Sequence, residues 1–163
     1  MAKTYKPIAT VTASGVSTFV VMSSIPQTYT DLVLVGIFPK TATNSARITL
    51  NNDTSSLYSQ TTLYGNGTSG LSGRETSAVR WFFVDFLQSS TSQPNMSITH
   101  FSNYSNTTTF KTAIDRSGVA DKGTVVSALL YRSTSAITRI DIDTGSGTFS
   151  AGTTFTLYGI KAA

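Results

Sequence analysis

The 163-residue sequence contains no cysteine, and this absence excludes several kinds of chemistry together. Without thiols there is no disulfide, no thiolate ligand for zinc and no cysteine nucleophile. Packing and hydrogen bonds must therefore hold the fold. A chain of about 150 residues buries roughly 68–70% of its unfolded surface, which is sufficient for one hydrophobic core. We expect a single domain spanning residues 1–163.

Charged residues are also scarce, at 12% of the chain against about 25% in typical domains. The net charge of +4 would suit an acidic partner such as nucleic acid, but the basic residues are scattered singly rather than gathered in a stripe with aromatic residues. We therefore expect no nucleic-acid partner. No run approaches the roughly 18 apolar residues of a membrane span, so we expect no membrane partner.

Residues that carry enzymatic chemistry are few. His100 is the only histidine and Glu75 the only glutamate, so neither a histidine-based triad nor a pair of glutamates is indicated. The glycines between Gly65 and Gly70 match the dinucleotide-binding spacing, but an aromatic strand follows where that motif requires a helix. We expect no catalytic residue, no metal site and no cofactor, and we interpret the chain as a structural or binding protein rather than an enzyme.

Two carboxylates, Asp141 and Asp143, alternate along one predicted strand and so share a face. The favoured interpretation pairs them with Arg132 or Arg139 across strands. Calcium is the alternative, because it accepts carboxylate oxygens, although no loop has the ligand spacing of an EF-hand.

What the chain does contain is serine and threonine, which make up about a third of it, and apolar residues that alternate with period two. Both features are typical of sheet proteins with hydroxyl-rich surfaces. We predict an all-β fold, an antiparallel two-sheet β-sandwich of jelly-roll type with about ten strands. Residues 7–22 read as a hairpin that turns at 14–15. The predicted strands are 7–13, 16–22, 31–37, 47–50, 79–87, 96–101, 110–114, 125–131, 137–142 and 155–160.

The segment 51–77 is dense in Ser, Thr, Gly and Asn and reads as a long polar loop. Loops of this length inside compact domains are often functional. We name Tyr58, Tyr64 and Tyr104 as exposed aromatic anchors of an interface. Asn66 and Arg74, from the same loop, are further candidate binding residues.

A resemblance runs through nearly the whole chain. Its segments are I-P-Q-T-Y-T-D-L-V-L at 25–34, L-N-N-D at 50–53 with Y-S at 58–59, N-Y-S-N at 103–106, K-T at 111–112, A-I-T-R-I at 136–140, and 149–160, which ends in T-L-Y-G-I. In these segments the sequence resembles a family of small virion proteins of tailed bacteriophages. The resemblance implies a β-sandwich that decorates the capsid or belongs to the tail or its fibres, and it brings no catalytic residues.

A separate chain of this length favours a capsid decoration or cement protein that stabilises the shell. A tail or fibre protein that binds a host-surface glycan or receptor is the alternative. The expected partners are copies of the same chain, as a trimer, and the major capsid or tail proteins. Residues 1–7, M-A-K-T-Y-K-P, have no apolar stretch like that of a signal peptide, so we expect synthesis in the host cytoplasm and location in the virion.

Overall fold

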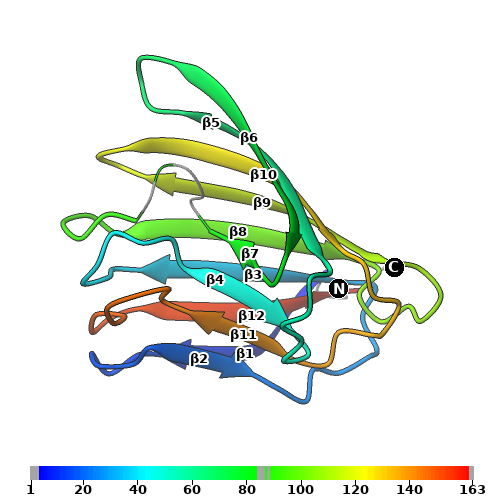
Figure 1. Ribbon diagram of the computed structural model, residues 1–163. Coiled ribbons are helices and arrows are strands. Elements are labelled where there is room, and N and C mark those ends of the chain that lie inside the picture. The colour runs from blue at the N-terminus through cyan, green and yellow to red at the C-terminus, as the bar shows by residue number, and fades with distance from the viewer. Residues whose placement is uncertain (1–3, 84–86, 88, 162–163) are drawn as a thin grey trace.

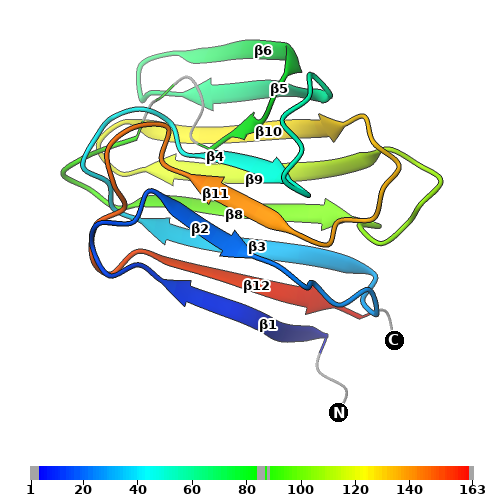
Figure 2. The same cartoon turned by 60° about the horizontal axis from the view of Figure 1, so that its bottom comes forward.

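The computed structural model describes residues 4–83, 87 and 89–161, and in these ranges the chain forms strands, turns and loops without a helix. Two antiparallel sheets lie face to face, a large one of eight strands and a small one of four (Figures 1 and 2). The predicted all-β sandwich is confirmed, with twelve strands where about ten were expected.

The large sheet has the order β1-β12-β3-β8-β9-β10-β5-β6, and the small sheet has the order β2-β11-β4-β7. The strands of the large sheet, in that order, are Tyr5–Thr12, Thr154–Ile160, Asp31–Phe38, Asn95–Ser102, Lys111–Val119, Gly123–Tyr131, Tyr58–Gly65 and Gly70–Ala78. Those of the small sheet are Phe19–Met22, Ile140–Asp143, Arg47–Leu50 and Trp81–Phe82.

The strand order is that of a jelly roll enlarged by two hairpins. When β9–β10 and β5–β6 are set aside, four strands remain in each sheet, in the orders β1-β12-β3-β8 and β2-β11-β4-β7. The chain then winds between the two sheets as a jelly roll does, with each sheet mixing strands from both halves of the sequence. The two hairpins extend one edge of the large sheet, where Figure 2 shows β5 and β6 beyond the small sheet.

The expected hairpin at residues 7–22 is wrong. β1 pairs with β12 in the large sheet, whereas β2 pairs with β11 in the small sheet. Alternation reports which residues face the core, and it does not report which strand is the neighbour. Of the strand expected at 79–87, the described residues form a strand only at Trp81–Phe82, which pairs with β4; residues 84–86 of that range lie outside the described residues.

The segment 51–77 is not a long loop. It contains β5 and most of β6, which pair with each other, and β5 also pairs with β10. The strands were missed because no residue of β6 is buried and two of the three buried residues of β5 are polar. Gln60 and Thr62 face inward and hydrogen-bond there, with Thr62 Oγ1 2.9 Å from Ser127 Oγ. A polar buried row removes the contrast on which strand prediction depends.

The core between the sheets is rich in aromatic rings. Phe38 stacks on Phe155 with ring centroids 5.4 Å apart, and Gly36 leaves the room that this pair needs, since a Cβ there would lie 2.6 Å from the Phe155 ring. Trp81 packs edge-on against Tyr58 at 5.6 Å. Its indole N–H is shared between the carbonyls of Ser59 and Leu130, at 3.1 and 3.2 Å. Trp81 thereby ties the small sheet to the added strands β5 and β10.

Candidate functional site

The outer face of the large sheet, turned away from the small sheet, carries exposed aliphatic side chains. Five of them, from β3, β8, β9, β10 and β5, are between 42% and 62% exposed. The register sets Ile37 opposite Met96 and Val126 opposite Leu63, with Ile114 one row further along. Monomeric proteins rarely leave apolar patches of more than a few hundred Å² uncovered, and larger ones mark interaction sites. This face is the candidate binding surface of the molecule.

A hollow of about 730 Å³ opens in this surface over β8, β9, β10, β5 and β6. Its shape follows from small side chains in register: Ala128 lies between Ile114 and Thr61 on the neighbouring strands. In the next row Leu130 lies between Thr112 and Ser59. The floor is therefore aliphatic along β9 and β10, and hydroxyls line it elsewhere.

Two guanidinium groups border the hollow. Arg74 stands on β6 opposite Thr61, is exposed, and has no hydrogen-bond or ion-pair partner among the described residues. Arg132 follows β10 and is held in place, because its Nη1 donates to Ser59 Oγ and its Nη2 donates to the carbonyl of Ser56 at 3.0 Å. No described residue that lines the hollow bears a carboxylate. The site therefore presents positive charge without a counter-charge of its own.

Two of the predicted interface residues are in the wrong place. Tyr58 and Tyr104 were expected to be exposed, but both are fully buried. The Tyr58 hydroxyl accepts the Leu50 N–H at 3.0 Å and donates to the Asp53 carbonyl at 2.9 Å. The Tyr104 hydroxyl donates to the Pro26 carbonyl. A tyrosine in a polar sequence segment looks exposed, yet these hydroxyls find backbone partners inside the fold.

The other three predicted residues lie on the β5–β6 hairpin. Tyr64 is half-buried and borders a second hollow of about 520 Å³ near the hairpin end. Asn66 forms the turn, because its Oδ1 accepts the N–H groups of Thr68 at 3.1 Å and Ser69 at 2.9 Å. Arg74 alone reaches the larger hollow. Asn66 is therefore a structural turn residue. Of the five predicted binding residues, Arg74 is the one that lines the larger hollow.

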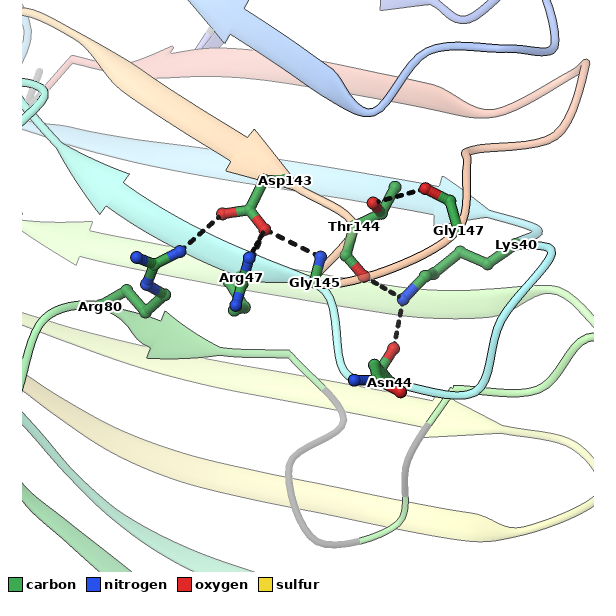
Figure 3. Close-up of polar contacts among 8 residues, drawn as sticks. All are labelled: Lys40, Asn44, Arg47, Arg80, Asp143, Thr144, Gly145 and Gly147. Atoms are coloured by element: carbon green, nitrogen blue, oxygen red, sulfur yellow. Dashed lines mark hydrogen bonds and ion pairs between the residues drawn. The ribbon is translucent and has the colours of Figure 1, made fainter.

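A charged cluster lies at one end of the sandwich, where the loops after β3 and β11 meet (Figure 3). Lys40 is 1% exposed, and its Nζ donates to the carbonyls of Thr144, at 2.6 Å, and Asn44. Burial lowers the pKa of Lys40 to about 8, against the attraction of Asp143, which raises it. With no open route to Nζ, this amine is suited to clamping two loops together and not to attacking a substrate.

Asp143 is part of the same cluster and holds two arginines (Figure 3). Its Oδ1 lies 2.5 Å from Arg47 Nη2, and its Oδ2 lies 3.3 Å from Arg80 Nη1. The Gly145 N–H also donates to Oδ1, at 2.8 Å. The carboxylate is only 6% exposed, so it is a buried junction between β4, β11 and the residue before β7.

Asp141 binds Arg139 two residues earlier in the chain, with Nε and Nη2 contacts of 2.6–2.9 Å. Arg139 was a predicted partner, although the pair runs along the chain and not across strands. The predicted partner Arg132 is wrong, because it lies at the hollow. No group of three or more His, Asp or Glu that could hold a metal occurs among the described residues. The calcium alternative gains no support from this geometry.

Two further carboxylates have partners that the sequence did not indicate. Asp115 of β9 is buried on the inner face of the large sheet and accepts hydrogen bonds from the hydroxyls of Ser97, Thr99 and Ser117. Burial raises its pKa, against the effect of those three hydroxyls. His100, which has no carboxylate beside it in the sequence, has Nε2 3.0 Å from an Asp31 oxygen. The Asp115 contacts join β9 to the preceding strand β8, whereas the His100 contact joins β8 to β3, 69 residues away in the sequence.

Sequence reasoning missed the outer face and the hollow, although one signal was present. Residues 125–131 read V-V-S-A-L-L-Y and are apolar at both parities. Such a strand is expected to be covered on both faces, yet β10 is covered on one face and leaves Val126 exposed on the other. An apolar strand on the open side of a sheet is a sign of a docking surface.

No protein-family model matches the chain, and no curated protein sequence matches it. In the part of the chain that the structure describes, there is no helix with the length and apolar character needed to cross a membrane. Fold and surface together define a jelly-roll β-sandwich with one aliphatic, arginine-bearing face left uncovered.

Proposed function

We propose that this chain is a capsid decoration protein of a tailed bacteriophage, which docks on the shell through the outer face of its large sheet and stabilises it. The observation that carries the proposal is the group of exposed aliphatic side chains on that face, with Ile114, Val126 and Leu63 each 47–62% exposed. Burying such side chains against a shell would contribute about 25 cal/mol per Å² of apolar area.

Three further features support this function. The face is built on strands and not on loops, so it is pre-formed and loses little conformational freedom on docking. The segments that resemble small virion proteins of tailed bacteriophages run from residue 25 to residue 160 and include the first half of β3 and the whole of β12. The proposal includes location in the virion, contact with the major capsid protein and assembly of the chain as a trimer. The hydroxyl-rich surface suits the wet, repeated contacts of such an assembly.

Add-back to phage particles that lack the protein tests the proposal. The wild-type chain should bind these particles and raise the temperature at which their shells open. A double variant, Ile114→Asp with Val126→Asp, should bind at least tenfold more weakly, because both changes place charge in the docking face. Val16→Asp is the control, since Val16 is 82% exposed but lies in the loop between β1 and β2. Absence of the protein from purified wild-type particles would refute the proposal.

A tail or fibre protein that binds a host-surface glycan is the second candidate. One observation favours it: the hollow of about 730 Å³ falls within the roughly 300–1,000 Å³ range of small-ligand sites. Immunogold labelling of intact particles separates the two functions. Label on the tail with binding to host polysaccharide would establish the second function, and label spread over the shell would exclude it.

A further inference from the structure

The hollow on the outer face combines an aliphatic floor with unbalanced positive charge. Ile114, Ala128 and Leu130 form the floor, and Arg74 and Arg132 border it. Guanidinium groups bind carboxylates through paired N–H donors, and they do so most strongly where apolar surroundings exclude water. The chemistry of the hollow therefore matches a carboxylate that is carried next to an aliphatic side chain.

The two arginines differ in a way that suits binding. Arg132 is already oriented by Ser59 and by the Ser56 carbonyl, which use two of its five N–H donors. Arg74 is exposed and has no partner among the described residues. One guanidinium is thus pre-positioned, and the other is available to close on a ligand from the β6 side.

A second copy of this chain is a poor source of the carboxylate. The outer face also carries Arg116, in register with Ile98 and Val126. The carboxylate that approaches this face, Asp31, is engaged by His100 and by the Asn103 N–H at 2.7 Å. Self-pairing of this face would bring the arginines of both copies into one interface, where their like charges repel. The net charge of +4 on each copy adds to this repulsion.

An acidic saccharide fits the charge but not the floor. No aromatic side chain is among the described residues that line the hollow, so a sugar ring would find no broad aromatic face to pack against there. An aliphatic floor instead suits a leucine, isoleucine or valine side chain.

We propose that this hollow binds an acidic segment of a partner virion protein, with an Asp or Glu carboxylate held by Arg74 and Arg132 and a neighbouring aliphatic side chain on the floor. The inference rests on the proposed function for the identity of the partner as a virion protein. The chemistry of the hollow itself does not depend on that function.

The first test measures binding to particles that lack the protein. Arg74→Glu with Arg132→Glu should weaken binding about a hundredfold, since each reversal replaces an attraction by a repulsion. Lys6→Glu with Lys161→Glu is the matched control, because it makes the same total change of charge at two exposed residues by the β1–β12 edge of the large sheet, which is the edge opposite to β5 and β6; it should weaken binding less than threefold. Equal losses of binding in the two double variants would overturn the inference. The proposal that the outer face docks on the shell would still stand.

The second test requires no particles and separates failure of the inference from failure of the proposed function. Capped Leu-Asp-Leu and Leu-Asn-Leu peptides are titrated into the wild-type protein while amide chemical shifts are followed by NMR. The aspartate peptide should shift amides of β5, β6, β9 and β10 that line the hollow, and the asparagine peptide should bind at least tenfold more weakly. Equal binding of both peptides would overturn the inference, as would tighter binding of an oligogalacturonate at the same amides, which would assign the hollow to a glycan.

Discussion

Tyr58 and Tyr131 stack face to face across β5 and β10, with ring centroids 4.7 Å apart and an interplanar angle of 22°. Both hydroxyls hydrogen-bond to the same residue. Tyr58 donates to the Asp53 carbonyl at 2.9 Å, and Tyr131 donates to Asp53 Oδ2 at 2.6 Å. Asp53 lies in the turn after β4, so the pair fastens the added hairpin strands to the small sheet.

Replacing Tyr131 by Phe should lower the free energy of unfolding by about 1–2 kcal/mol, because it removes a hydrogen bond to a carboxylate. Burial raises the pKa of Tyr131 to about 12, and its bond to Asp53 acts in the same direction, so the donor stays protonated through the neutral range. Urea unfolding measures the change. Tyr158→Phe is the control, since the Tyr158 hydroxyl has no hydrogen-bond partner among the described residues. Equal effects of the two variants would contradict the prediction.

Stability should rise with pH between about 8 and 10.5 because of Lys40. Its pKa is about 8 in the folded chain against an ordinary value of 10.5. In that window the unfolded chain binds more protons, so raising the pH favours the folded state. The full gain is on the order of 3 kcal/mol, present above the upper value and lost as pH falls through the lower one.

Urea unfolding of wild type and Lys40→Met across that pH window is the appropriate measurement. Tyrosines titrate in both proteins, so the difference between the two slopes isolates the lysine. The variant should lack the rise. Parallel slopes would show that Lys40 does not titrate in this range.

Asp143→Asn should destabilise the fold by about 2–4 kcal/mol, because Arg47 and Arg80 would be left partly buried without their counter-charge. Asp141→Asn is the comparison, and it should cost less, since Arg139 is 40% exposed and can turn towards water. Thermal unfolding at low and high salt ranks the two variants. A larger loss in Asp141→Asn would mean that the cluster in Figure 3 is not the stronger junction.

Gly36→Ala should destabilise by about 1–3 kcal/mol through overpacking, because the new methyl group would meet the Phe155 ring at 2.6 Å and the Phe38 ring at 3.3 Å. Gly70→Ala is the matched change, in β6 with no atom within 4 Å of the added Cβ. It should alter stability by no more than about 0.5 kcal/mol. Chemical denaturation of both variants tests the pair, and similar losses would refute this account of Gly36.

The local alternation of apolar and polar residues was sufficient to predict several strands. It was not sufficient to predict which strands pair with each other. The predicted strand 47–50 coincides with β4 (Arg47–Leu50), because its alternation ends at a clear turn. The apolar run 31–37 became β3, which lies between β12 and β8 inside the large sheet. Residues 7–22, however, divide between two sheets. Pairing over such distances depends on the packing of the whole chain, which no local window contains.

The candidate site was predictable in part. Arg74 was named from its segment, but Arg132 was interpreted as a partner of the aspartates, because the alternation of Asp141 and Asp143 says nothing about which arginine lies nearby. Tyr58 shows the opposite failure, since its polar neighbours concealed a core position. The middle of the hollow depends on the register of β9, β10 and β5, which sets Ala128 between the larger Ile114 and Thr61. This depression can be recognised only when the register is known.

The two added hairpins have a consequence for how this fold can change. The jelly-roll frame of eight strands keeps its winding without them, while most of the hollow is built from β9, β10, β5 and β6. The added strands therefore carry most of the candidate binding surface, while they contribute only a few residues, among them Tyr58 and Tyr131, to the core between the sheets. Side chains on the outer face of β9, β10, β5 and β6 can therefore change to suit a different partner, as long as Tyr58 and Tyr131 keep their places in the core.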